Sequence, residues 1–521
     1  MSFNIIDIFN RCIVIERIND ECYETAEECD VFLNGKLFIR TKQNVITVDG
    51  LDPDTAYSVS LGGETKEFRT KKESILLDVK KFGAKADGMH ADTMAIQAAI
   101  NVCPADGTVY LGKGTYFTGP IFLKSNVTLW LDEGAVILAD PDRNNYPILP
   151  GIVRNIYDND VEYNFASWEG NPLDCFASVI TAVDVNDAAI IGRGTIDGNA
   201  DKSDWWINVR QKRIAWRPRL LFFANCKGIK VNRVMLRNSA SWAVHPYYSD
   251  DLCFYDVNIW NPSNSPNTDG LDPESCSNVT LLGIKISVGD DCIAIKSGKI
   301  YMAGAHYKRT SNIEIRNCRF ERGHGSITVG SEVACGIDGV HVSHCIFSET
   351  DRGLRIKTRR GRGEKSLING LFFEKIKMDR VHMPVTVNMF YFCDPDGHSA
   401  YVQDQGPLPV DYRTPKVGEI KIKDIECTGV DACFICANGL PESPIEKISV
   451  ENVNVSYLPE GKRTPQCPIM MDGFPKYSGK SMFLKNVKFF EANNVTVNGA
   501  ADNSPEIINV TDVKTDSLRF E

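Results

Sequence analysis

A fixed spacing of apolar residues recurs along most of the chain. Each copy has an apolar residue at a starting position and again two, five and seven residues later, and eight copies fit between residues 229 and 455. Every one of these positions is apolar, although only 43% of the chain is hydrophobic. Residues two apart lie on the same face of a β-strand. Each copy therefore predicts two short strands separated by a bend, as in Val279, Leu281, Ile284 and Ile286.

The distance between copies indicates the architecture. Most copies begin 23 to 34 residues after the previous one, with one gap of 49. Two strands, a turn and a third strand fill such a period, and this is the coil of a parallel β-helix. A leucine-rich horseshoe would need a leucine ladder and a shorter period. The sequence therefore predicts an all-β chain, with a right-handed single-stranded parallel β-helix over residues 75–521.

The first coil of this domain is expected to be covered by a helix. Residues 92–100 combine Asp92, a preferred N-cap residue, with an amphipathic spacing of apolar residues. A capped helix at this place would protect the open sheet edge of the first coil.

Residues 1–74 have a different pattern of short alternating runs. Asn34-Gly35 stands between two such runs, which is a strong signal for a β-hairpin. The stretch from Gly50 to Tyr57 resembles the corner of a fibronectin type III module, in which a tyrosine hydroxyl holds a strand crossing. We therefore predict a small fibronectin type III-like β-sandwich over residues 1–74.

The third strands of neighbouring coils can be aligned by their apolar residues. Ile293, Ile327 and Leu354 lie fourteen residues after the start of three successive copies. Leu271 takes the same place one coil earlier. Since residues in register on adjacent coils lie about 4.8 Å apart, distant polar residues should converge on one face. The residues expected to meet there are Asp269, Asp290, Asp291, His324, Arg355 and Lys357.

This group has the chemistry of a glycosidase site. Three clustered carboxylates raise the pKa of at least one of them, which supplies a proton donor. Cleavage of a glycosidic bond needs one protonated carboxyl and one ionised carboxylate. Arg355 and Lys357 flank Ile356, so strand alternation turns both outward. Together they suit the carboxylate of an anionic sugar.

Four short segments carry a family resemblance. Asn267-Thr268-Asp269-Gly270, Gly289-Asp290-Asp291-Cys292, Gly323-His324-Gly325 and Arg355-Ile356-Lys357 resemble the signature segments of glycoside hydrolase family 28, the polygalacturonases, in the family's order. The resemblance extends over roughly residues 75–500 and includes the opening segment 82–88. Each segment alone is more often a solvated turn or strand face, so their combined order and shared register carry the signal.

The resemblance implies an activity and a role for each residue. It implies an enzyme that hydrolyses α-1,4-linked galacturonic acid in pectin and inverts the anomeric configuration. Asp290 resembles the general acid, His324 the group that supports it, and Asp269 with Asp291 the pair that activates water. Arg355 and Lys357 resemble the residues that hold the galacturonate carboxylate. Further candidates for substrate binding are Asn267, Tyr391 and His245. No metal or other cofactor is expected.

Composition narrows the setting. A formal net charge of −10 disfavours nucleic acids and anionic membranes as partners, because both need a basic surface. The 17 cysteines show no zinc-site spacing, and free thiols in such number favour a reducing compartment. The first 20 residues form no signal-peptide core, and no apolar run approaches 18 residues. We expect a cytoplasmic protein, or a secreted one if a leader has been removed. The oligomeric state stays open.

Two long insertions suggest attack on chain ends. Residues 140–175 and about 392–416 interrupt the coils, and loops of this length are usually functional. They could close one end of the cleft, so that only the terminus of an oligogalacturonide enters. Nearby basic residues are expected to grip its carboxylates: Arg359, Arg360 and Arg413.

Two alternatives remain, and a third is disfavoured. The chain could be a rhamnogalacturonan or xylogalacturonan hydrolase of the same family, since Arg355 and Lys357 do not exclude substituted backbones. It could be a non-catalytic β-helix adhesin or carbohydrate-binding protein, which would need no acid–base group. A pectate lyase shares the β-helix but would use calcium and an arginine base, and the four segments do not match that pattern.

Overall fold

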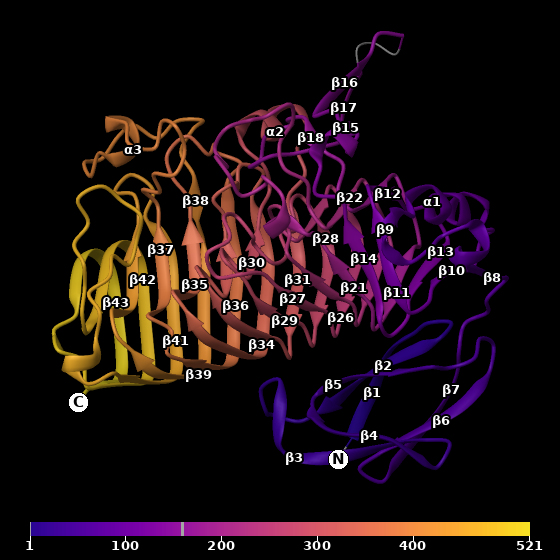
Figure 1. The fold of residues 1–521 in the computed structure, drawn as a ribbon. Coiled ribbons are helices and arrows are strands. Elements are labelled where there is room, and N and C mark those ends of the chain that lie inside the picture. The colour runs from indigo at the N-terminus through magenta and orange to yellow at the C-terminus, as the bar shows by residue number, and fades with distance from the viewer. Residues whose placement is uncertain (1, 158–160) are drawn as a thin grey trace.

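The computed structural model describes residues 2–157 and 161–521 and divides into a small antiparallel sandwich and a long parallel β-helix (Figure 1). The sandwich has a three-stranded sheet of order β1-β2-β5 and a four-stranded sheet of order β4-β3-β6-β7. We call residues 2–69 the N-terminal sandwich. Its strands are β1 (Ser2–Ile8), β2 (Cys12–Ile18), β3 (Glu24–Leu33), β4 (Lys36–Gln43), β5 (Val45–Asp49), β6 (Ala56–Leu61) and β7 (Glu64–Arg69).

Two local predictions for the N-terminal sandwich are confirmed. Asn34 and Gly35 join β3 to β4 with φ angles of 49° and 74°, the left-handed values that a tight hairpin turn requires. The hydroxyl of Tyr57 accepts a hydrogen bond from the backbone N–H of Asp52 at 2.9 Å, as in a tyrosine corner. The predicted boundary near residue 74 falls between β7 and the first strand of the β-helix, β8 (Leu76–Asp78).

The parallel β-helix stacks each coil on the previous one through three columns of strands. The first column contains β8, β10 (Gly107–Leu111), β13 (Val127–Leu131), β20 (Ala189–Gly192), β23 (Lys230–Asn232), β26 (Asp250–Tyr255), β28 (Ser277–Leu282) and β31 (Thr310–Arg316). The second contains β9 (Asp87–Ala91), β11 (Gly114–Thr118), β14 (Ala135–Ala139), β21 (Thr195–Asp197), β24 (Met235–Arg237), β27 (Asn258–Trp260), β29 (Lys285–Ser287) and β32 (Arg319–Gly323).

Later coils fuse the first two columns into long bent strands, and the last two coils take in the third column as well. The long strands are β34 (Ile337–Thr350), β36 (Leu367–Asp379), β39 (Glu419–Val430), β41 (Ile445–Tyr457), β42 (Lys480–Asn498) and β43 (Glu506–Phe520). The third column contains β12 (Ile121–Phe122), β19 (Ile180–Val183), β22 (Leu221–Ala224), β25 (Val244–Tyr247), β30 (Ile293–Ile295), β33 (Ile327–Val329), β35 (Arg352–Lys357), β37 (Met383–Asn388) and β40 (Cys433–Asn438).

The repeated frame explains this architecture. All frame positions of the eight copies lie in the core, with at most 4% of each side chain exposed. The bend comes four residues after the start of each copy, where one residue takes a left-handed φ between 50° and 69°. That residue shifts the strand alternation and turns the chain to the second column. The eight bend residues are Arg233, Asp256, Gly283, Asn317, His344, Lys375, Asp424 and Asn452.

The predicted helix is present with Asp92 at its N-cap position, but the Asp92 side chain does not cap it. Helix α1 (Thr93–Val102) buries Ile96 and Ile100 against the first coil. Asp92 precedes it, yet its carboxylate accepts from the backbone N–H groups of Lys85 and Ala86 at 2.6 and 3.0 Å. Within residues 2–157 and 161–521, no helix is long and apolar enough to cross a membrane.

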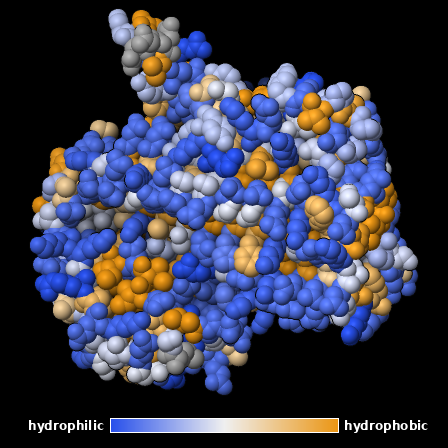
Figure 2. Space-filling model, turned by 180° about the vertical axis from the view of Figure 1, so that it is seen from behind, coloured by the Kyte–Doolittle hydropathy of each residue, from blue (hydrophilic) through white to orange (hydrophobic). Residues whose placement is uncertain are grey.

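Short elements fill the long connections. Two antiparallel pairs lie in the first insertion, β15 (Ile148–Leu149) with β18 (Cys175–Phe176) and β16 (Ile152–Asn155) with β17 (Val161–Asn164). The second pair projects outward from the molecule (Figures 1 and 2), while Glu162 and Asn164 of β17 bind His306 and Tyr247 of the β-helix at its base. The others are α2 (Ile300–Ala305), α3 (Ala400–Gln403), β38 (Lys416–Val417) and the 3₁₀ turns Val79–Phe82, Arg143–Asn145, Ala200–Lys202 and Glu460–Lys462.

The N-terminal sandwich lies along the bends of the β-helix. Bend residues contact it, among them Arg233 through Thr47, Gly283 through Val45, Asn317 through Asn44, His344 through Tyr23 and Lys375 through Cys22. At Gly283 an added Cβ would lie 2.6 Å from Val45, so this contact requires glycine.

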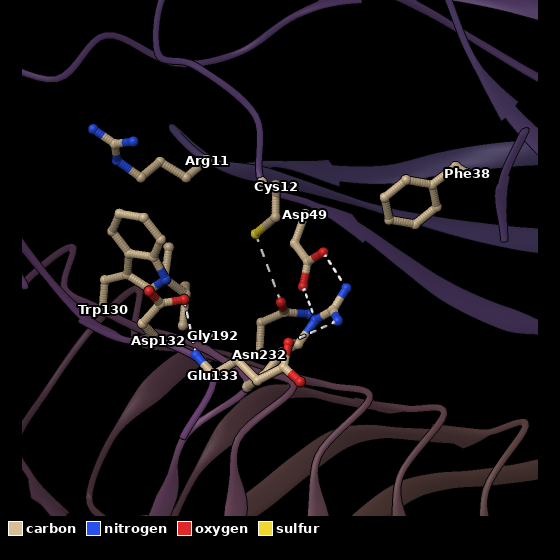
Figure 3. Close-up of a pocket in the computed structure, with 12 residues that line it drawn as sticks. Arg11, Cys12, Phe38, Asp49, Trp130, Asp132, Glu133, Gly192 and Asn232 are labelled. Atoms are coloured by element: carbon tan, nitrogen blue, oxygen red, sulfur yellow. Dashed lines mark hydrogen bonds and ion pairs between the residues drawn. The ribbon is translucent and has the colours of Figure 1, made fainter. Parts of the chain in front are cut away.

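Ion pairs and a small gap complete the junction. Asp49 reaches from the N-terminal sandwich to the β-helix (Figure 3), where both its oxygens accept from Arg193 at 2.7 Å. A cavity of about 350 Å³ remains beside this pair. Arg11, which also lines the cavity, is held by Glu73, so its charge is already neutralised. The two parts of the chain are therefore fastened along a shared length rather than joined only by a linker.

Candidate active site

The predicted register of the third strands is confirmed. Leu271 pairs with Ile293, which pairs with Ile327, which pairs with Leu354. Asp269 and Asp291 consequently lie on adjacent coils, where the N–H of Gly270 donates to the carbonyl of Asp291 at 2.9 Å.

The three aspartates form one cluster. One carboxylate oxygen of each lies within 4.8 Å of the others. Asp269 and Asp291 are 4% and 1% exposed, while Asp290 is half-buried. The carboxylate of Asp290 also accepts from the backbone N–H of Asp291 at 2.9 Å. The accessible carboxyl in the group is thus Asp290, as a proton donor to substrate requires.

Arg355 and Lys357 point outward as predicted, but they are buried. Both point out of the coil, but surrounding residues bury them to 6% and 7% exposure. Each donates to Asp291 at 2.8 Å, and the two bonds go to different oxygens of that carboxylate. Burial acts to raise the pKa of Asp291, but Lys357 and then Arg355 outweigh it and hold that pKa well below its usual range.

Asp269 has the opposite environment. Burial, followed by repulsion from Asp272 and Asp290, raises its pKa well above the usual value. Asp272 is itself fully buried, with a raised pKa from the same cause, and lies 3.6 Å from Lys296. The site therefore pairs an ionised carboxylate, Asp291, with a carboxyl that favours its protonated form.

His324 lies one coil beyond Asp290. Its backbone N–H donates to the carbonyl of Asp290 at 2.9 Å. Its Nδ1 is 2.8 Å from the carboxylate of Asp351, and this hydrogen bond raises the imidazole pKa in spite of partial burial. The predicted closeness of His324 and Asp290 is thus seen in the structure.

A metal ion does not fit the cluster. Carboxylate oxygens are the ligands that Ca²⁺ and Mg²⁺ prefer, but both oxygens of Asp291 already accept from Arg355 and Lys357. A cation bound there would face two fixed positive charges at close range.

Tyr391 and Asn267 are brought to this site. Tyr391 is 8% exposed, and the ammonium of Lys357 lies 5.4 Å from the centre of its ring. The side-chain oxygen of Asn267 accepts from Arg217 at 2.6 Å. Arg217 therefore orients the Asn267 amide.

The prediction that His245 binds substrate is wrong. Its side chain is fully buried, and Nε2 is 2.9 Å from Glu274, inside the wall of the β-helix. It packs edge-on against Trp242 at 4.9 Å. Burial lowers the pKa of His245 well below its usual value. A residue without solvent access cannot contact substrate, so its role is structural.

The sequence did not point to several residues beside the cluster. Lys296 donates to Glu332 at 3.0 Å, and its ammonium lies 4.7 Å from the ring centre of Trp242. The alternation that turns Arg355 outward from Ile356 also applies to Lys296 after Ile295, so this signal was available. Met470, whose sulfur is 3.1 Å from Arg355, follows it by 115 residues and had no signal.

The comparisons with known proteins fit this geometry. The profile of glycosyl hydrolases family 28 matches residues 158–474, which is more than half of the chain. The chain belongs to glycosyl hydrolases family 28. A second profile, rhamnogalacturonase A/epimerase, pectate lyase-like, matches residues 76–139 at the start of the β-helix.

Individual relatives agree with this assignment. The endo-polygalacturonase of Pectobacterium carotovorum subsp. carotovorum is 31% identical over 320 residues, covering 59% of this chain and 74% of that protein. The family 28 exopolygalacturonase of Yersinia enterocolitica is 18% identical, with a TM-score of 0.71 over 99% of this chain and 98% of that chain. The hyperthermoactive exopolygalacturonase of Thermotoga maritima is 22% identical, with a TM-score of 0.65 over 83% and 91%. Both structures show that the fold, including the N-terminal sandwich in the first, is shared.

Proposed function

We propose that this family 28 enzyme is a polygalacturonase that hydrolyses α-1,4-galacturonic acid linkages in pectin. The observation that carries the proposal is the cluster of Asp269, Asp290 and Asp291 with two buried cations on its edge. The polygalacturonase relatives support it. One guanidinium nitrogen of Arg355 donates a hydrogen bond to the sulfur of Met470. Because thioether sulfur is a weak acceptor, a galacturonate carboxylate can displace it.

The residues divide the reaction between them. Asp290 donates its proton to the glycosidic oxygen, which leaves with the electrons of the broken C1–O bond. Water attacks C1 from the opposite side and gives its proton to the Asp269–Asp291 pair, in which Asp291 supplies the ionised carboxylate. Asp290 is left as a carboxylate and regains a proton from solvent. Acid catalysis and water activation are thus assigned to different carboxyls.

The separation of the acid and base carboxyls bears on the stereochemistry of the reaction. Inverting enzymes usually separate acid and base by about 6.5–9.5 Å, and retaining enzymes by about 5–5.5 Å, whereas these oxygens approach within 4.8 Å. The 4.8 Å value joins single oxygens rather than whole carboxyl groups, so it does not distinguish the two outcomes. The charges favour inversion, because Asp291 is neutralised by Arg355 and Lys357 and Asp269 is buried, and both are consequently poor nucleophiles.

We expect inversion, with the β-anomer as the first product from an α-linkage. The measurement is proton NMR of the anomeric region within the first minutes of hydrolysis, before mutarotation. An initial α-anomer would show that a carboxylate attacks the sugar and would remove the water-activating role from Asp269 and Asp291.

We further propose exo action. Three segments meet beside the catalytic group. Lys299 donates its backbone N–H to Gly170 of the first insertion at 2.9 Å, and its ammonium pairs with Asp394 of the second at 2.9 Å. An added Cβ on Gly170 would lie 2.7 Å from Glu332, whose pKa is lowered, in spite of burial, by Lys296 first and by Lys357 among others. We call these joined segments the wall. The wall reaches the buried cations of the site and supports a pocket closed at one end.

The basic residues expected to grip the chain terminus have other partners, so that part of the prediction is wrong. Arg359 is held by Asp394 and Asp396, and Arg360 by Glu442. Arg413 pairs with Asp411 in its own turn. These ion pairs hold the insertions in place rather than presenting free cations to substrate.

The product pattern tests exo action. We expect polygalacturonate to lose viscosity slowly while one small product accumulates, in contrast to the endo-polygalacturonase of P. carotovorum assayed alongside. Asp394→Asn, which weakens the wall, should raise the share of longer products. Asp411→Asn breaks a pair in the same insertion away from Lys299 and should leave the pattern unchanged. An early fall in viscosity with mid-length products from the unmodified enzyme would exclude exo action.

A further inference from the structure

A ladder of alternating charge runs along the site. The position eleven residues after the start of five successive copies holds Asp290, His324, Asp351, His382 and Asp431. Backbone hydrogen bonds stack these turns. The N–H of Asp351 donates to the carbonyl of Gly323 at 2.9 Å, beside the bond that the N–H of His324 donates to the carbonyl of Asp290. The ladder thus begins at the proposed acid and continues away from it along the β-helix.

The histidines of the ladder are both paired in the same direction. His324 Nδ1 lies 2.8 Å from Asp351, and His382 Nδ1 lies 2.9 Å from Asp431. Each imidazole is bound by the carboxylate of the following coil. With Nδ1 engaged in this way, Nε2 is the nitrogen of His324 left to face substrate, and the side chain is 52% exposed. The carboxylate therefore fixes which nitrogen of His324 faces substrate.

We propose that Asp351 is a positioning residue, which holds His324 as an oriented cation beside Asp290 during hydrolysis. The inference rests on the proposed function, because it assigns a partner to the acid of that reaction. Among residues 2–157 and 161–521, the Asp351 side chain makes no hydrogen bond or ion pair with the clustered aspartates, Arg355 or Lys357, so it acts through His324.

The surrounding charges are consistent with this role. His324 faces Asp351, Asp290 and Asp291, and the first of these contributes most to its raised pKa. Burial acts to raise the pKa of Asp351, but His324, followed by Arg352 and His382, outweighs it, so Asp351 is held ionised.

A cation at His324 has a clear use in the reaction. When Asp290 gives its proton to the leaving oxygen, a carboxylate develops in a site that already holds the ionised Asp291. A fixed positive charge next to Asp290 stabilises this developing charge. The alkaline limb of the activity profile should then report loss of the proton from His324. Since Asp351 raises the imidazole pKa, removing its charge should move that limb to lower pH.

The test combines a pH profile with a direct titration. In Asp351→Asn we expect the alkaline limb of kcat/KM to move about one pH unit towards acid, and the imidazole resonance of His324, assigned with His324→Gln, to titrate lower by the same amount. Asp351→Glu should restore both. The control is Asp87→Asn, which breaks the 2.7 Å pair with His90 at the start of the β-helix and should change neither.

Each outcome decides the proposal. An unchanged His324 titration in Asp351→Asn would overturn it, and so would a shifted titration with an unchanged pH profile. If Asp351→Asn lowers the melting temperature, the proposal is tested with Asp351→Glu instead. That variant must match the unmodified enzyme in its pH profile and in the titration of His324. The NMR titration needs no substrate. If the unmodified enzyme did not hydrolyse polygalacturonate, the proposed function would fail while the contact between Asp351 and His324 could still be measured.

Discussion

Replacing Asp290 with asparagine is expected to lower kcat on an oligogalacturonide by about 10²–10⁴-fold, the usual contribution of a positioned general acid. Asparagine has nearly the same shape and can still accept the hydrogen bond from the backbone N–H of Asp291. It cannot give up a proton to the leaving oxygen. Because Asp290 is half-buried, the melting temperature should change little. Initial rates and a thermal melt on the same preparation provide the measurement.

Two comparisons sharpen this experiment. Asp338→Asn changes an exposed aspartate elsewhere on the β-helix and should keep full activity. A galacturonosyl fluoride needs no proton for its leaving group, so Asp290→Asn should lose far less activity on it than on the oligomer. If more than a tenth of the activity on oligogalacturonide survived, Asp290 could not be the acid.

Replacing Lys357 with alanine is expected to reduce both activity and stability. Removing one partner of a buried ion pair typically costs about 3–5 kcal/mol, because the other charge stays buried. Lys357 donates to Asp291 at 2.8 Å with both side chains buried. The same ammonium is proposed to hold the galacturonate carboxylate, so kcat/KM should fall with it. Chemical denaturation and steady-state kinetics measure the two effects.

The stability loss should depend on pH with a defined sign. The pKa of Asp291 lies below its unfolded value, so the stability that this group contributes is complete above about pH 4. It declines as the pH falls towards the folded pKa. The cost of Lys357→Ala should therefore be largest near neutrality and shrink in acid. Lys488→Ala breaks an exposed pair with Glu446 and should cost about 0–1 kcal/mol. Equal costs in the two variants would contradict the burial argument.

The sequence was sufficient for the features that depend on local repetition. The frame around Val279 predicted the coil, and the alignment of Leu271 with Ile293 predicted which aspartates meet. Such predictions succeed because stacked coils repeat one short-range pattern, so a register found in one coil holds in the next. The corner at Tyr57 is local in the same sense.

The features that the sequence did not predict depend on which distant loop covers a residue. Strand alternation correctly predicted that Arg355 points out of the coil. The burial of Arg355 comes in part from Met470, more than a hundred residues later in the chain. Nothing in the sequence indicated that Glu442 pairs with Arg360, so Arg360 was predicted to be available to substrate. His245 was misjudged because the pattern gave no sign of its buried partner, Glu274. Periodicity tells where a side chain points and not what it meets.

The N-terminal sandwich has a consequence for how the molecule comes apart. A stack of coils in which each contacts only its neighbours can fray from either end, one repeat at a time. Here the N-terminal sandwich is attached at bends from Arg233 to Lys375, and the proposed catalytic residues from Asp269 to Lys357 lie within that span. These coils must open together or not at all. The coils from Glu419 onward lie beyond this attachment, and because Met470 covers Arg355, loosening them would expose the buried cations of the site before its coils open.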